Sequence, residues 1–108
     1  MDIKGVKIDY LGHSGFLIDY PNNGNGKRIA IDPYNVSENL GKVDAVLITH
    51  SHFDHCSIKD IQKLAKEGAL IVVPADAQSK ITRVEHVNMQ VVEVGDSFEI
   101  GKMKIEVL

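Results

Sequence analysis

The sequence has one cysteine, no tryptophan and no long uninterrupted apolar run. Because Cys56 has no second cysteine to pair with, an intrachain disulfide is excluded and a reducing cytoplasm is the expected location. The longest apolar run, 69–75, is far shorter than the roughly 20 residues that a membrane-spanning helix needs. The first residues also lack the basic and then apolar character of a secretory signal, so we expect neither a membrane segment nor export.

Basic charge is sparse as well. Lys and Arg number 12 against 15 Asp and Glu, which makes the formal net charge −3, and they form no dense run. This balance disfavours nucleic acid as a partner, which leaves a small neutral or anionic molecule as the expected substrate. With 108 residues, of which 44% are hydrophobic, we expect a single α/β unit over 1–108.

Apolar periodicity and turn residues predict the order of the elements. Strands are predicted at 6–10, 16–20, 28–31, 43–49, 70–73, 89–94, 97–100 and 102–107. A Ser-x-x-Asp capping pattern at Ser57 and Asp60 predicts a helix over 57–67, with Gly68 as its C-terminal cap. Pro74 is expected to open a short helix over 76–81. The segment 102–107 still alternates like a strand shortly before the last residue, so we expect that the chain ends within a domain.

The most informative segment directly follows the predicted buried strand 43–49. It places His50, His52, Asp54 and His55 within six positions. Imidazole and carboxylate ligands suit zinc, manganese or iron, and zinc is the favoured ion. Extended backbone would direct His50 and His52 toward one ion, while Asp54 and His55 would turn toward the next helix, so two neighbouring ions are plausible.

The pattern His50-x-His52-x-Asp54-His55 resembles the metal-binding signature of the metallo-β-lactamase superfamily. Further similar segments are Leu11-Gly12-His13-Ser14-Gly15-Phe16, Ile31-Asp32-Pro33 and 43–50. They resemble the branch that contains the bacterial ascorbate-phosphate lactonase and many small metal-dependent hydrolases, and the resemblance covers essentially all of the chain. It implies one half of an αββα sandwich, with a mixed sheet and helices on one of its faces.

The resemblance also implies a function and residue roles. The chain would be a metal-dependent hydrolase that cleaves an ester, lactone or phosphoester with a metal-activated hydroxide. His50 and His52 would bind a first divalent ion, and Asp54 and His55 a second. Asp54 would also be catalytic, because it orients the attacking water.

The family adds further ligands, in a second half, that this sequence does not contain. Four side chains are too few for two metal sites that each need about four ligands. The alternative is therefore a metal-binding half-module or a fragment, inactive until a C-terminal half or a second copy of the chain completes it.

Two further residues are candidates for the surroundings of the site. His13, in a glycine-rich turn, either reaches the metal pocket or bonds only to backbone. Asp32 either accepts a hydrogen bond from a metal-bound histidine or caps the turn at Pro33. Cys56 is interpreted as a packing residue, and His86 as a surface residue without a role.

Overall fold

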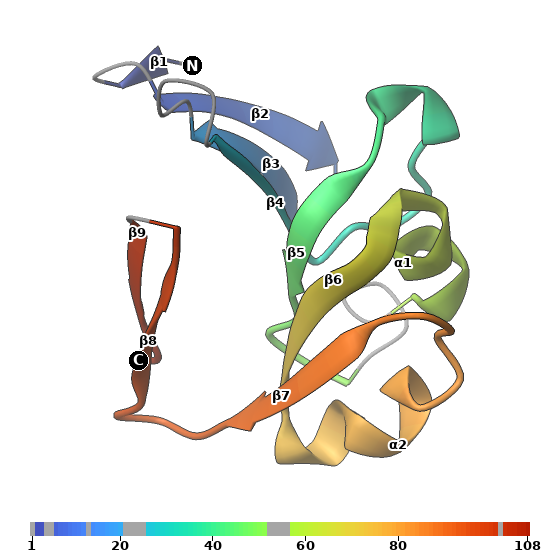
Figure 1. Ribbon diagram of the computed structural model, residues 1–108, viewed down its shortest axis with the longest axis vertical. Helices are drawn as coiled ribbons and strands as arrows, with labels where there is room; N and C mark the ends of the chain where they lie inside the picture. The colour runs from blue at the N-terminus through green and yellow to red at the C-terminus, as the bar shows by residue number, and fades with distance from the viewer. Residues whose placement is uncertain (1, 4–5, 13, 21–25, 52–56, 102) are drawn as a thin grey trace.

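The chain is built around one mixed β-sheet, with short helices on one face and a separate hairpin on the other (Figure 1). The computed structural model describes residues 2–3, 6–12, 14–20, 26–51, 57–101 and 103–108. The strands are β1 (Asp2–Ile3), β2 (Val6–Gly12), β3 (Gly15–Tyr20), β4 (Lys27–Ile31), β5 (Val43–Leu47), β6 (Ala65–Pro74), β7 (Asn88–Val92), β8 (Ser97–Ile100) and β9 (Met103–Glu106). The helices are η1 (Glu38–Leu40), α1 (Ile58–Leu64), η2 (Ala75–Ala77) and α2 (Gln78–Ile81).

The seven-stranded sheet runs in the order β1-β2-β3-β4-β5-β6-β7. Neighbouring strands are antiparallel from β1 to β4 and parallel from β4 to β7. Parallel strands all end at the same edge of a sheet, so the segments that follow β4, β5 and β6 leave from one side. The segment that contains Asp32 and the segment that leads to His50 therefore both start at this edge.

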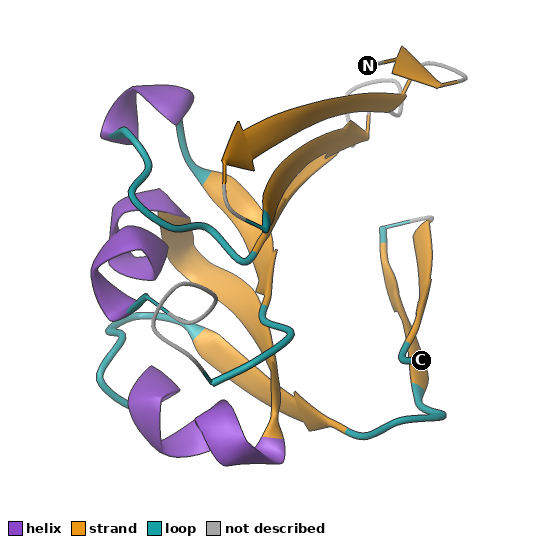
Figure 2. Cartoon of the chain, turned by 180° about the vertical axis from the view of Figure 1, so that it is seen from behind, coloured by secondary structure: helices purple, strands orange, loops and turns teal. Residues whose placement is uncertain are grey.

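The helices cover one face of the sheet, and the β8–β9 hairpin lies over the other (Figure 2). The prediction of an α/β fold with a mixed sheet and helices on one face is confirmed. Within the described ranges, no helix is long and apolar enough to cross a bilayer.

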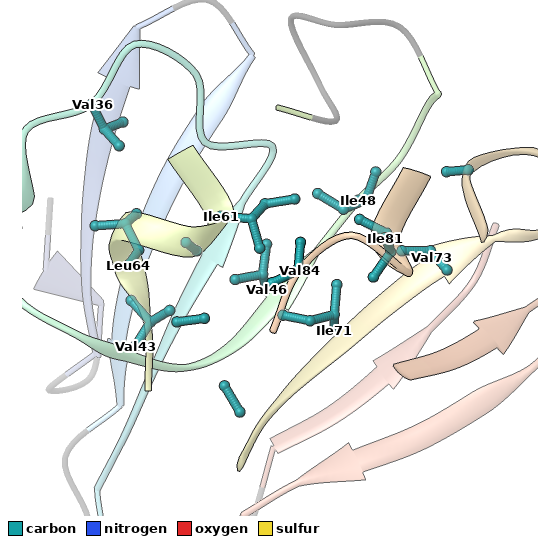
Figure 3. Close-up of a cluster of buried hydrophobic side chains, with 14 of the residues drawn as sticks. Val36, Val43, Val46, Ile48, Ile61, Leu64, Ile71, Val73, Ile81 and Val84 are labelled. Carbon is teal, nitrogen blue, oxygen red and sulfur yellow. The ribbon is translucent and has the colours of Figure 1, made fainter. Parts of the chain in front are cut away.

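The main core lies between the helices and the sheet (Figure 3). Ile61 and Leu64 come from α1 and Ile81 from α2, and they meet Val46 of β5 and Ile71 of β6 in one buried cluster. The apolar residues of α1 recur at helical spacing, which is why one side of so short a helix can be buried. This core fixes α1, and with it the chain that leads into α1, against the sheet.

A smaller cluster lies on the opposite face. Ile29 of β4, Ala45 of β5 and Ile100 of β8 are buried there, with Phe98 and Ile105 of the hairpin packed against them. A Cβ built on Gly101, at the hairpin turn, would lie 3.1 Å from Cγ of Lys27, so the turn approaches the start of β4 closely. The hairpin is thus held to the sheet mainly by apolar contacts.

The prediction for the end of α1 was wrong. The helix begins after the predicted cap Ser57, whose hydroxyl accepts from the Asp60 amide at 3.3 Å, but it ends at Leu64 instead of residue 67. Ala65 is already extended and pairs with Val43 of β5. Gly68 does have a left-handed φ of +81°, but it lies inside β6. Pairing with β5 has therefore overridden the local helical pattern.

The other predicted elements are present, with small differences at their ends. The strand predicted over 43–49 ends at Leu47, although the Ile48 amide still donates to the Val72 carbonyl at 2.8 Å. The short strand β1 and the turn η1 were not predicted.

Two carboxylates bridge elements of the helix-covered side. Asp44 of β5 accepts from the Arg28 amide at 2.8 Å and from Lys66 Nζ at 2.9 Å. Asp60 of α1 accepts from the amides of Asn35 and Val36 at 2.9 and 3.0 Å. Burial raises the pKa of both carboxyl groups, but these hydrogen bonds and the neighbouring lysines outweigh it, so both pKa values lie below the ordinary 3.8.

We expect Ile71→Ala to lower the free energy of unfolding by about 2–5 kcal/mol, because Ile71 is fully buried and its loss leaves a cavity. Urea denaturation followed by circular dichroism measures this change. Val94→Ala is the control, since Val94 is 80% exposed and its truncation should cost no more than about 0.5 kcal/mol. Equal losses in the two variants would contradict the described core.

We also expect acid to weaken the fold through Asp44 and Asp60. A lowered folded-state pKa means that the unfolded chain binds more protons, so the stabilisation is present above pH 3.8 and is lost as the pH falls through the folded-state values. Urea unfolding between about pH 5 and about pH 2.5 should show this decline. In Asp44→Asn the decline should be shallower, and a curve parallel to that of the original protein would contradict the lowered pKa.

Candidate metal centre

The candidate site begins at Asp32, the first residue after β4. Asp32 is only 2% exposed, and its amide donates to the Leu47 carbonyl at 3.0 Å. Its φ of +44° lies in the left-handed region, which aspartate tolerates better than most residues. This backbone turn directs the chain away from the sheet at the carboxyl end of β4.

The Asp32 carboxylate binds the residue that precedes the first motif histidine. Oδ1 accepts from the Thr49 amide at 2.8 Å, and Oδ2 accepts from the Thr49 hydroxyl at 2.5 Å. A buried carboxylate is stable only when donors surround it, so these bonds fix Thr49 relative to β4. The backbone one residue before His50 is therefore held from a neighbouring strand.

The Thr49 side chain in turn contacts the imidazole of His50. Oγ1 of Thr49 lies 2.8 Å from Nδ1 of His50. The hydroxyl has one proton, which it donates to Asp32, so it must accept from Nδ1–H of the imidazole. A neutral imidazole protonated at Nδ1 carries its lone pair on Nε2, the form in which Nε2 can bind a metal ion.

The other motif residues, His52, Asp54 and His55, lie outside the described residues, as do His13 and Cys56. In the part of the chain that the structure describes, no three His, Cys, Asp or Glu side chains form a metal cluster. The ligand roles of these residues therefore stay predictions. His86 is exposed, as predicted for a surface residue, and its Nε2 lies 3.9 Å from the Glu85 carboxylate.

Gly15, at the start of β3, lies beside Asp32. A Cβ built on Gly15 would lie 3.0 Å from the Asp32 carbonyl oxygen and 3.3 Å from the Gly12 carbonyl oxygen. Any side chain at residue 15 would force these backbones apart.

Both described ends of the motif are held by groups outside it. On the N-terminal side, Nζ of Lys80 in α2 donates to the Ser51 carbonyl. On the C-terminal side, the Ser57 hydroxyl donates to Oδ2 of Asp60 at 2.6 Å and caps α1. Sequence analysis identified Ser57 and Asp60 only as a cap and did not identify Thr49 or Lys80. For Thr49 the signal was its position next to His50, whereas nothing in the sequence pointed to Lys80.

A cavity of about 620 Å³ lies on the hairpin side of the sheet. Most of its lining is apolar, including Ile29, Leu47, Phe98 and Ile105, and one part of its wall is formed by Thr49. The apolar face of the sheet is therefore only partly filled by the hairpin. The cavity reaches the same sheet edge from which His50 projects.

Comparison with known proteins agrees with this arrangement. The Beta-lactamase superfamily domain matches residues 7–108. A UPF0173 metal-dependent hydrolase of Bacillus cereus is 35% identical over 109 residues, covering 93% of this chain, and one of Koribacter versatilis is 40% identical over 81 residues, covering 68%. A solved structure from Parabacteroides distasonis, described as a metal-dependent hydrolase, is 30% identical over 94% of the chain, with a TM-score of 0.79.

These relatives are longer than the chain. It spans 45% of the Bacillus cereus protein, 33% of the Koribacter versatilis protein and 44% of the solved structure. The match nevertheless includes almost the whole of the present sequence. The chain therefore belongs to the beta-lactamase superfamily.

Proposed function

We propose that this protein is a metal-dependent hydrolase whose metal centre is built on the segment that begins at His50. The observation that carries the proposal is the chain of hydrogen bonds from Asp32 through Thr49 to His50 at the carboxyl edge of the parallel strands. Ligand sites in open α/β sheets occur preferentially at such an edge. The names of the relatives, which describe metal-dependent hydrolases, support the same class.

The donor set fits a divalent cation. His50 has its Nδ1 engaged by Thr49, so Nε2 presents the lone pair that a metal ligand needs. His52 would share the first ion with His50, and Asp54 and His55 would hold a second. Mixed imidazole and carboxylate ligands suit zinc, which we favour over manganese and iron.

The chemistry that we propose is hydrolysis of an ester, lactone or phosphoester. A bound divalent ion would lower the pKa of water and stabilise the charge that develops on the attacked group. Asp54 would orient the attacking water as the catalytic residue, while Asp32 and Thr49 hold the histidine in position. The net charge of −3 argues against nucleic acid, so we propose a small neutral or anionic molecule as the substrate, and the single cysteine supports a cytoplasmic location.

A second candidate function is a metal-binding half-module that needs a further half to act. Two observations favour it: the chain spans about half of its relatives, and the face of the sheet opposite the helices holds an incompletely filled apolar cavity. In this case a C-terminal half, or a second copy of the chain, would cover that face and supply the remaining ligands. Native mass spectrometry separates the two candidates. A metal-loaded monomer of 11.9 kDa supports a hydrolase site complete in this chain, whereas a metal-free monomer, or metal bound only in a dimer, supports the half-module.

His50→Ala and Asp54→Ala should each lower the bound metal and abolish hydrolysis of a chromogenic ester or phosphoester, because each removes a ligand from the proposed centre. Metal content by elemental analysis and the initial rate are the two measurements. The control is His86→Asn, which removes an exposed histidine at a φ of +62° and replaces it with a residue that tolerates this conformation. If both alanine variants kept their metal and their rate, the proposal would be wrong.

Thr49→Val should weaken metal binding by about tenfold, a typical cost of losing a group that orients a ligand. Valine has nearly the shape of threonine but cannot bridge Asp32 and His50. The amide of residue 49 can still donate to Asp32, so the backbone position should be retained. Competition with a chromophoric chelator gives the affinity, and Thr49→Ser, which keeps the hydroxyl, should restore it. An unchanged affinity in Thr49→Val would show that the hydroxyl does not orient His50.

A further inference from the structure

The segment 32–36, which links β4 to η1, contacts both ends of the proposed metal-binding segment. Asp32, at its start, holds Thr49 through two hydrogen bonds. Asn35 and Val36, at its end, donate their amides to Asp60 of α1. One short loop is therefore bonded to the residue before His50 and to the helix that begins three residues after His55.

The Asp60 side chain is buried and has several hydrogen-bond and ion-pair partners. It is 3% exposed, and its two carboxylate oxygens accept from two backbone amides and from the Ser57 hydroxyl. Lys63 Nζ lies 3.6 Å from Oδ1 and itself donates to the Val36 carbonyl at 2.9 Å. Asn35 has a left-handed φ of +54°, which helps aim successive amides of the loop at one carboxylate.

An N-cap alone does not require this arrangement. Capping of α1 needs only the bond from the Asp60 amide to the Ser57 hydroxyl. The Asp60 side chain instead reaches residues 24 and 25 positions earlier in the chain. The core already packs α1 and β4 in one cluster, and this carboxylate adds a polar connection between Ser57 and the loop that begins at Asp32.

We propose that Asp60 is a positioning residue for the metal centre, because it ties the helix start that follows the motif to the loop whose Asp32 holds Thr49 before it. The inference rests on the proposed function. Asp60 touches neither metal nor substrate in this role. Asp60 would fix the distance between the residues on either side of the proposed ligands. The ligands would then need less ordering when the metal binds, so less conformational entropy would be lost.

Asp44 provides a matched control within the same chain. Like Asp60, it is a partly desolvated carboxylate that accepts from a backbone amide and pairs with a lysine. It joins β4, β5 and the start of β6, and none of its described partners adjoins the motif. The same Asp→Asn change therefore tests position rather than the loss of a hydrogen-bonded carboxylate in general.

The experiment measures the affinity of the purified protein for Co²⁺ alone, by visible absorption and by competition with a chelator, well below the unfolding temperature of every variant. Asp60→Asn should bind Co²⁺ at least about tenfold more weakly than the original protein, whereas Asp44→Asn should stay within about threefold. The Co²⁺ absorption bands should also change in Asp60→Asn alone, because they report ligand geometry.

Variants of Ser57 test the same role through Co²⁺ affinity, and this test does not require that Asp60→Asn folds. Ser57→Ala removes the hydroxyl that joins Asp60 to the end of the motif and should weaken Co²⁺ binding, and Ser57→Thr should restore it. Equal Co²⁺ affinities in the original protein, Asp60→Asn and Ser57→Ala would overturn the positioning role and leave the hydrolase proposal standing. An original protein that binds no Co²⁺ would overturn both.

Discussion

The parallel pairing of β4, β5 and β6 is the constraint on which the rest of the structure depends. Ile31 lies opposite Leu47, and Leu47 opposite Val72, so β4 and β5 end level with one another and β6 continues to Pro74. The Asp32 amide and the Ile48 amide continue the pairing for one more residue on each side. As a result, the loop after β4 and the motif after β5 begin side by side, and a buried carboxylate from one can bind the other.

Buried carboxylates join segments of the chain that strand pairing does not connect. Asp32 and Asp60 are the buried charged residues in the described ranges, and both accept backbone amides from a different segment. A carboxylate removed from water must be satisfied by donors, which is why each fixes its partners firmly. Every buried side-chain polar atom described in the structure has a hydrogen-bond partner. The polar framework around the proposed metal-binding segment thus includes residues outside it.

Much of the fold could be predicted from the sequence because its signals are local. Alternating apolar residues identified the strands, and the Ser57 cap identified the start of α1. The end of α1 could not be predicted, since Ala65 leaves the helix in order to pair with Val43 of β5. The hairpin β8–β9 was predicted as two strands, but its place over the second face depends on contacts with Ile29 and Ala45.

The sequence by itself determined the order of the elements, the family resemblance and the candidate ligands His50, His52, Asp54 and His55, because these depend on residues close together in the chain. Only the tertiary structure decided what holds the described residues of this segment, Thr49, His50 and Ser51. Thr49 lies 17 residues from Asp32, and Ser51 lies 29 residues from Lys80. Such contacts depend on strand register and loop path, which no local periodicity encodes.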